Sequence, residues 1–263
     1  MTQFVLRFYY FLEDDIDSLK KLTEIFSRNG LNLGTRNIPL AAKQPEGVYY
    51  DLDYPQGKIK ILAVKTSMDT DYWQAALENL RSWENEDPLA VCDIMGSLTI
   101  LVGTDSWEEM TEKACEKIPG GAGEILELKN GEMSYLKHDR SKGEAIYLCR
   151  LDQIESVDLS FLFRRMPSFY AGVLRLQAMD FVLNDRLLSI RREKDEMQQD
   201  LINILHAKLV MNQATLIEAE ELEDEIRRLA TAYGKLVGDQ NMVVDGLKQL
   251  ETTTSRYAKT LQN

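Results

Sequence analysis

Proline is scarce in the second half of this sequence. The chain of 263 residues has six prolines, and none of them follows Pro167. A proline inside a helix removes a hydrogen bond and clashes with the preceding turn. Nothing of this kind interrupts a helix between Ser168 and Asn263, so uninterrupted helices of unusual length are permitted there.

Residues that commonly hold metals or perform catalysis are also few. The three cysteines lie far apart without CxxC or Cys/His spacing, which argues against a zinc site and indicates buried thiols in a reducing compartment. Neither histidine, His138 or His206, lies beside a nucleophile pattern. We therefore expect no enzyme activity and no catalytic residue.

Basic residues are outnumbered by acidic ones, and long apolar runs are absent from the sequence. The net charge is −12, with −9 in residues 1–167 and −3 in residues 168–263. An acidic chain repels nucleic acid and anionic lipid, so we expect no nucleic-acid partner. No apolar run has the length of a transmembrane helix, and residues 1–12 do not resemble a signal peptide. We expect a cytoplasmic chain.

The first part of the sequence alternates strand and helix patterns. Residues 3–12 are aromatic and β-branched, as in a strand, and Asp14 or Asp15 can cap a helix that ends at Asn29-Gly30. Hairpins are predicted at residues 48–65 and around Asn130-Gly131. These patterns predict an acidic, mixed α/β domain over residues 1–152.

The last part carries a heptad pattern. Its positions alternate in steps of four and three, and only Gln240 and Thr254 are not apolar. The positions are Leu222, Ile226, Leu229, Tyr233, Leu236, Gln240, Val243, Leu247, Leu250, Thr254, Tyr257 and Leu261. Val237 and Val244 widen the stripe, which favours a bundle with at least two partners over an isolated two-stranded coil.

Together these patterns predict an α+β protein. The α/β domain is followed, over residues 153–263, by a long antiparallel helical hairpin that forms a coiled-coil stalk. Ser168 is the expected cap of its first helix, and the turn is expected near residues 211–214. We expect a homo-oligomer assembled through residues 168–263.

Clusters of acidic residues are the remaining candidate for a ligand site. Carboxylates shared between subunits could bind Mg²⁺ weakly through water. The candidate metal ligands are Asp14, Asp15, Asp17, Glu218, Glu221 and Asp224. The alternative is that they cap helices, complement the helix dipole or lie on solvated faces.

Two stretches of the helical part resemble a known family. Residues 169–176 (FYAGVLRL) and 255–263 (SRYAKTLQN), together with the acidic α/β domain before them, resemble the cytosolic part of CorA-type divalent-cation transporters and of CorA-like membrane proteins. The Gly-Met-Asn signature of that family is absent. The resemblance implies a ring of subunits and a membrane segment beyond Asn263, at the cytoplasmic face of the membrane.

Two functions follow as hypotheses. In the first, the chain is the cytosolic regulatory and assembly domain of a CorA-like protein, which senses divalent cations and transmits that state along its stalk helices. In the second, it is a soluble coiled-coil adaptor or oligomerisation protein without a transport role. Assembly through long helices is common to both.

Overall fold

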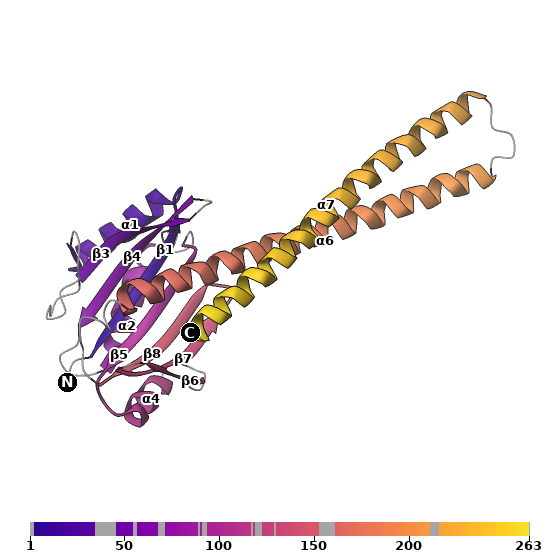
Figure 1. Cartoon of the computed structure of the whole chain (residues 1–263). Coiled ribbons are helices and arrows are strands. Elements are labelled where there is room, and N and C mark those ends of the chain that lie inside the picture. The colour runs from indigo at the N-terminus through magenta and orange to yellow at the C-terminus, as the bar shows by residue number, and fades with distance from the viewer. Residues whose placement is uncertain are drawn as a thin grey trace. The chain divides into compact units, whose positions relative to one another are not determined.

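The computed structural model describes most of the chain (Figure 1). The described residues are 3–34, 46–54, 57–67, 72–88, 90, 94–116, 118, 123–128, 130–152, 161–210 and 216–262. The chain divides into two compact units, residues 1–174 and 175–263. The predicted boundary at residues 152/153 lies earlier, because the first turns of a long helix pack within the first unit.

The first unit contains an eight-stranded mixed sheet, which makes the protein α+β. The strands are β1 (Phe4–Leu12), β2 (Asn32–Gly34), β3 (Glu46–Tyr54), β4 (Gly57–Ser67), β5 (Gly96–Gly103), β6 (Ile125–Leu128), β7 (Gly131–Asp139) and β8 (Glu144–Leu151). Their order is β2-β3-β4-β1-β5-β8-β7-β6. The pairs β2/β3 and β5/β8 are parallel and the other pairs are antiparallel.

Helices cover both faces of this sheet. One face packs against α1 (Ile16–Arg28), α2 (Tyr72–Glu84) and α4 (Trp107–Cys115), around residues such as Phe26, Trp73 and Met110. The other face packs against the π-helix η1 (Phe161–Arg165) and the start of α6 (Met166–Val210). Strand β1 lies in the middle of the sheet, and all of its residues but Leu12 are buried.

Most predicted elements of this unit are confirmed. The first strand, the helix after Asp15 and both hairpins are present. Ser106 caps α4, because its Oγ accepts a hydrogen bond from the Glu109 amide at 3.3 Å. Residues 90–102 also have a strand pattern in the sequence, and the strand there begins at Gly96. Residues 153–166 have a helical pattern in the sequence, and residues 153–160 of it lie outside the described part.

The predicted helix cap at Ser168 is wrong. Helix α6 begins at Met166, and Pro167 lies in its first turn, where a missing N–H costs no helical hydrogen bond. The Ser168 hydroxyl donates to the Arg164 carbonyl at 2.6 Å instead. Ser168 is thus part of the helix, which continues the turn begun by η1.

The start of α6 is fixed to the sheet by two tyrosines. Tyr170 donates a hydrogen bond to the Gly143 carbonyl at 3.0 Å, and Tyr10 of β1 donates to the Pro167 carbonyl at 3.1 Å. The two rings also contact each other, with centroids 5.6 Å apart. Leu174 packs against Gly96 and Gly143, whose lack of a side chain lets it approach the backbone closely.

The second unit consists of α6 from Arg175 and of α7 (Leu216–Gln262). The two helices contain 45 and 47 residues. Ile190 of α6 packs with Leu236 and Val243 of α7. Leu183 lies against Gly246, and Arg186 forms an ion pair of 2.6 Å with Asp239. The predicted turn at residues 211–214 lies outside the described residues.

Only some of the heptad positions on α7 are buried, which differs from the expectation. Leu236 and Val243 are buried, and Leu229, Leu247 and Leu250 are half-buried. Ile226 and Tyr233, expected in the same seam, are 42% and 48% exposed. A pair of helices covers only a narrow stripe on each, so the positions on the flank of the stripe stay exposed.

Gly96 offers a test of the α6 attachment. A Cβ at this position would collide with the Gly143 carbonyl and lie 2.6 Å from Leu174 Cδ2. We expect Gly96→Ala to destabilise the first unit by about 1–3 kcal/mol. Tryptophan fluorescence during urea unfolding checks this, since Trp73, Trp83 and Trp107 all lie in that unit.

Gly238→Ala is the matched control. Gly238 lies in α7 with nothing within 4 Å of an added Cβ. The substitution should leave the fluorescence transition unchanged and stabilise α7 by about 0.5–1 kcal/mol, as measured by far-UV circular dichroism. An unchanged midpoint in Gly96→Ala would contradict the close packing of α6 on the sheet.

Candidate functional site

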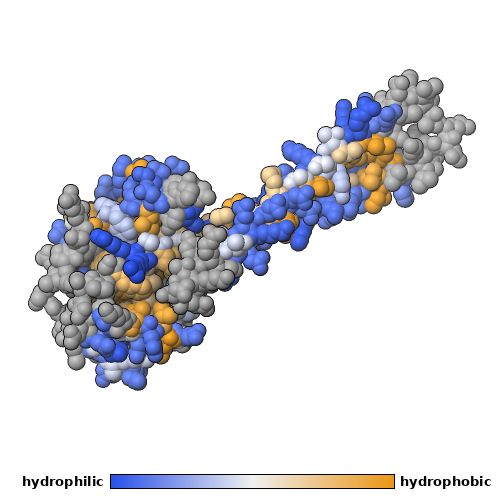
Figure 2. All heavy atoms as spheres, in the orientation of Figure 1, coloured by the Kyte–Doolittle hydropathy of each residue, from blue (hydrophilic) through white to orange (hydrophobic). Residues whose placement is uncertain are grey.

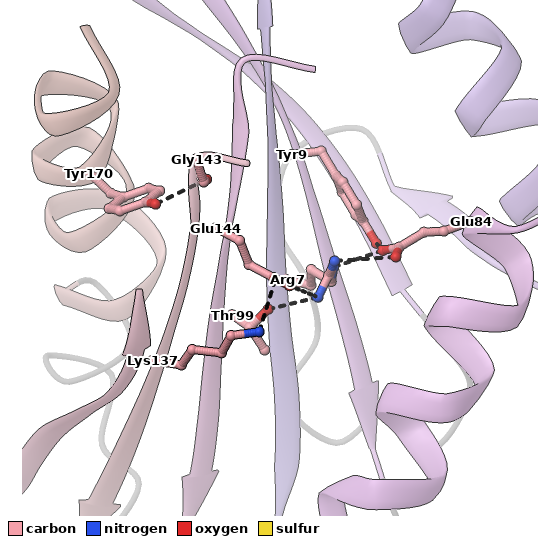
Figure 3. A network of polar contacts seen from close by, with 8 residues as sticks. All are labelled: Arg7, Tyr9, Glu84, Thr99, Lys137, Gly143, Glu144 and Tyr170. Carbon is pink, nitrogen blue, oxygen red and sulfur yellow. Dashed lines mark hydrogen bonds and ion pairs between the residues drawn. The ribbon is translucent and has the colours of Figure 1, made fainter. Parts of the chain in front are cut away.

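A network of charged and polar side chains lies on the α2 side of the sheet (Figure 3). Its centre is Arg7, which is 5% exposed in the middle of β1. Arg7 Nη2 donates to Glu84 Oε2 at 3.2 Å, and Nη1 donates to Thr99 Oγ1 at 3.0 Å. Arg7 Nε lies 2.8 Å from Glu84 Oε1, an ion pair without hydrogen-bond geometry.

The sheet register explains why these groups meet. Arg7 and Thr99 are directly paired in the β1/β5 ladder. Glu144, at the start of β8, pairs with Ser97, two residues from Thr99 in β5, and lies 3.6 Å from Arg7 Nη1. Lys137 of β7 follows at 3.9 Å from the other oxygen of Glu144. The network thus links α2 and strands β1, β5, β8 and β7.

Tyr9 completes the network. Its hydroxyl donates to Glu84 Oε1 at 2.6 Å, and the Arg7 guanidinium lies 5.4 Å from the centre of its ring. Burial and the Glu84 carboxylate raise the pKa of Tyr9 well above its usual value. Burial disfavours the charged form of Arg7, but Tyr9, Glu84 and Glu144 outweigh it and raise the pKa of Arg7. Arg7 therefore stays charged and Tyr9 stays neutral.

The charges within this network balance. The cations of Arg7 and Lys137 face the carboxylates of Glu84 and Glu144, and each contact of Arg7 described above is to another group of the first unit. The geometry fits a buried crosslink that holds α2 against strands β1, β5, β8 and β7.

A second buried cation lies on β4. Lys65 is 1% exposed, is paired in the β3/β4 ladder with Glu46, and has its Nζ 5.4 Å from the centre of the Phe4 ring. Burial lowers the pKa of Lys65, and Glu46 counteracts this. Arg7 and Lys65 are thus both buried cations of the sheet with an acidic residue on a neighbouring element.

The predicted metal ligands are spread over both units. Asp14 and Asp17 are exposed, Asp15 is half-buried, and Asp17 lies 3.8 Å from Lys20. Asp224 is exposed at 3.7 Å from Arg227. Glu218 and Glu221 belong to α7, with side chains outside the described part. Within the described ranges, no three His, Cys, Asp or Glu side chains gather closely enough to hold one metal ion.

The Arg7 network was missed in the sequence. The available signal is Arg7 itself, the one charged residue in the aromatic strand at residues 4–12. A charge at the centre of a buried strand needs a partner, but the sequence does not say which carboxylate supplies it. Glu84 follows 77 residues later and ends a helix rather than a strand.

A candidate interaction surface lies on the helix pair of the second unit. Large apolar side chains are exposed along both helices, and Figure 2 shows apolar groups among hydrophilic ones there. They are Met179, Phe181, Val182, Leu188, Leu201, Ile202, Ile226, Tyr233, Val237, Met242 and Val244. In the described part of the chain, no helix has an apolar stretch sufficient to cross a membrane.

Comparisons with known proteins give no relative. No protein-family model, curated protein or solved structure matches this chain. Function must therefore be argued from the buried Arg7 network and the helix surface just described.

Removing one partner of the buried ion pair tests the crosslink. Glu84→Leu leaves Arg7 buried with only the more distant Glu144 carboxylate, so we expect a loss of about 3 kcal/mol in unfolding free energy. Arg7→Met combined with Glu84→Leu should cost less than the two single changes together, with a coupling of about 1–3 kcal/mol. Urea unfolding of the four proteins in this cycle provides the measurement.

An exposed ion pair provides the control for that cycle. Asp17 is 92% exposed beside Lys20, so Asp17→Asn should change stability by less than about 0.5 kcal/mol. Additive effects of the Arg7 and Glu84 substitutions would contradict a crosslink between them.

The raised pKa of Tyr9 predicts a loss of stability at alkaline pH. The unfolded chain releases the tyrosine proton near its ordinary pKa of about 10, while the folded chain retains it. Above that pH the unfolded state binds fewer protons, so unfolding becomes easier as pH rises. In Tyr9→Phe the decline between pH 10 and 11 should be shallower than in the wild type, as measured by urea midpoints. Parallel declines in the two proteins would show that Tyr9 ionises normally.

Proposed function

We propose that this chain is an assembly protein. In this proposal the α/β unit is a rigid head, and α6 and α7 form an antiparallel hairpin that acts as a coiled-coil stalk and binds other copies of the chain. The contacts of Leu183 with Gly246 and of Arg186 with Asp239 support the antiparallel direction, because the residue number falls along α7 as it rises along α6.

The observation that carries the proposal is the imbalance between helix length and burial. The helices contain 45 and 47 residues, yet the apolar cluster between them has only Ile190, Leu236 and Val243 as buried members within the described part. Exposed apolar surface of this extent is typical of interaction sites. Helix pairs with wide apolar stripes gain stability by joining larger bundles.

Regulation by divalent cations, as in CorA-like proteins, is the second candidate. The net charge of −12 and the exposed Asp14 and Asp17 at the start of α1 favour it. Carboxylates that share a cation between copies would make assembly depend on Mg²⁺. In that case the stalk helices would transmit the bound state toward a membrane segment.

Light scattering over a range of concentrations tests both candidates on the full chain. The assembly function predicts an oligomer whose mass is the same in EDTA and in millimolar Mg²⁺. A mass that changes on addition of Mg²⁺ would favour the cation-regulated function over it. A monomer at every concentration, with and without Mg²⁺, would contradict assembly.

A further inference from the structure

The exposed apolar residues of α7 are concentrated on one flank of the helix. With 3.6 residues per turn, Ile226, Tyr233, Val237 and Val244 lie within about 40° of one another around the axis. Their common direction is about 90° away from that of Leu236 and Val243, which face α6. They are 42%, 48%, 38% and 37% exposed. We call these four residues the α7 stripe.

The opposite flank of α7 differs in character. Arg228, Lys235 and Asp239 lie there, and Asp239 is engaged by Arg186. Met242 is 68% exposed on that side. The α7 stripe is therefore a property of one flank and does not reflect a helix that is apolar all round.

The spacing of the residues in the α7 stripe is the same in both chain directions. Ile226 and Val244 are each nine residues from Lys235, and Tyr233 and Val237 are each two residues from it. When two such helices pair in opposite directions about Lys235, Ile226 meets Val244 and Tyr233 meets Val237. A surface that fits itself about a two-fold axis is the signature of an isologous interface.

The charges beside the α7 stripe select between the two possible directions. Glu223 and Lys248 lie on the same border of the stripe, near its two ends, and are 72% and 71% exposed. Antiparallel pairing brings Glu223 next to the second copy's Lys248 at both ends. In a parallel pair, residues on the same border of the stripe lie on opposite sides of the interface, so neither Glu223 nor Lys248 gains a partner of opposite charge from the other's position.

We propose that α7 pairs with α7 of a second copy of this chain, antiparallel and centred on Lys235, through the α7 stripe and two Glu223–Lys248 contacts between copies. This inference rests on the proposed assembly function and specifies its interface. The existing ion pairs of Glu223 with Arg227 and of Lys248 with Asp245 lie on the exposed helix surface, so their exchange for contacts between copies costs little.

Two substitutions in the same helix test the apolar part of the interface. Val237→Asp places a carboxylate in the α7 stripe and should raise the dissociation constant of the assembly by about 10–100-fold. Met242→Asp makes the same kind of change on the opposite flank and should leave it unchanged. Sedimentation of the full chain measures both, and circular dichroism checks that both keep their helix content.

Exchange of the two charges tests the direction of pairing. Glu223→Lys and Lys248→Glu should each weaken self-association, because each creates two like-charge contacts. The double variant should restore it, and a mixture of the two single variants should form a mixed assembly. Lys235→Glu, which lies off the stripe, is the matched control and should behave as the wild type.

The outcomes separate this inference from the assembly function. A wild-type chain that is monomeric overturns both. A wild-type oligomer that tolerates Val237→Asp, or whose single charge variants are not rescued in the double variant, overturns the antiparallel α7 interface and leaves assembly in place. Loss in the single variants with rescue in the double variant supports the interface.

Discussion

Strand β1 must be covered on both of its faces, and the architecture of the first unit follows from that requirement. Its residues Phe4, Leu6, Phe8 and Tyr10 enter one apolar cluster, while Val5, Tyr9 and Phe11 enter the other. One face is covered by α1, α2 and α4, and the other by η1 and the start of α6. Arg7 is the exception on this strand, and its burial requires the carboxylates of Glu84 and Glu144. The same strand thus fixes the sheet, the position of α2 and the first turns of α6.

The two units differ in how completely they bury their apolar surface. The sheet of the first unit has layers on both faces, and its central cation has partners at 2.8–3.6 Å. The described part of the second unit buries few apolar residues and exposes many. Since the hydrophobic effect scales with the area removed from water, surface left exposed on a long helix favours association. This contrast is the physical basis for the proposal that α6 and α7 mediate assembly while the first unit supports them.

Local patterns predicted the elements well and their partners poorly. The strand at residues 3–12 and the Asn130-Gly131 hairpin depend on neighbouring residues, and each is confirmed. The parallel β5/β8 pair and the Arg7–Glu84 contact join distant segments, for which a single sequence carries no signal. The heptad pattern located α7 correctly but placed Ile226 and Tyr233 in the buried seam. Periodicity shows which residues share a face of a helix. How much of that face is buried depends on the helix that packs against it.

Amide hydrogen exchange of the full chain at low and high protein concentration tests the central claim most directly, because it reports on each helix separately. Assembly through the stalk predicts that exchange in residues 226–244 slows as concentration rises, while exchange in β1 and β5 stays the same. Exchange in residues 226–244 that is independent of concentration would contradict the claim that these helices are completed by other copies of the chain.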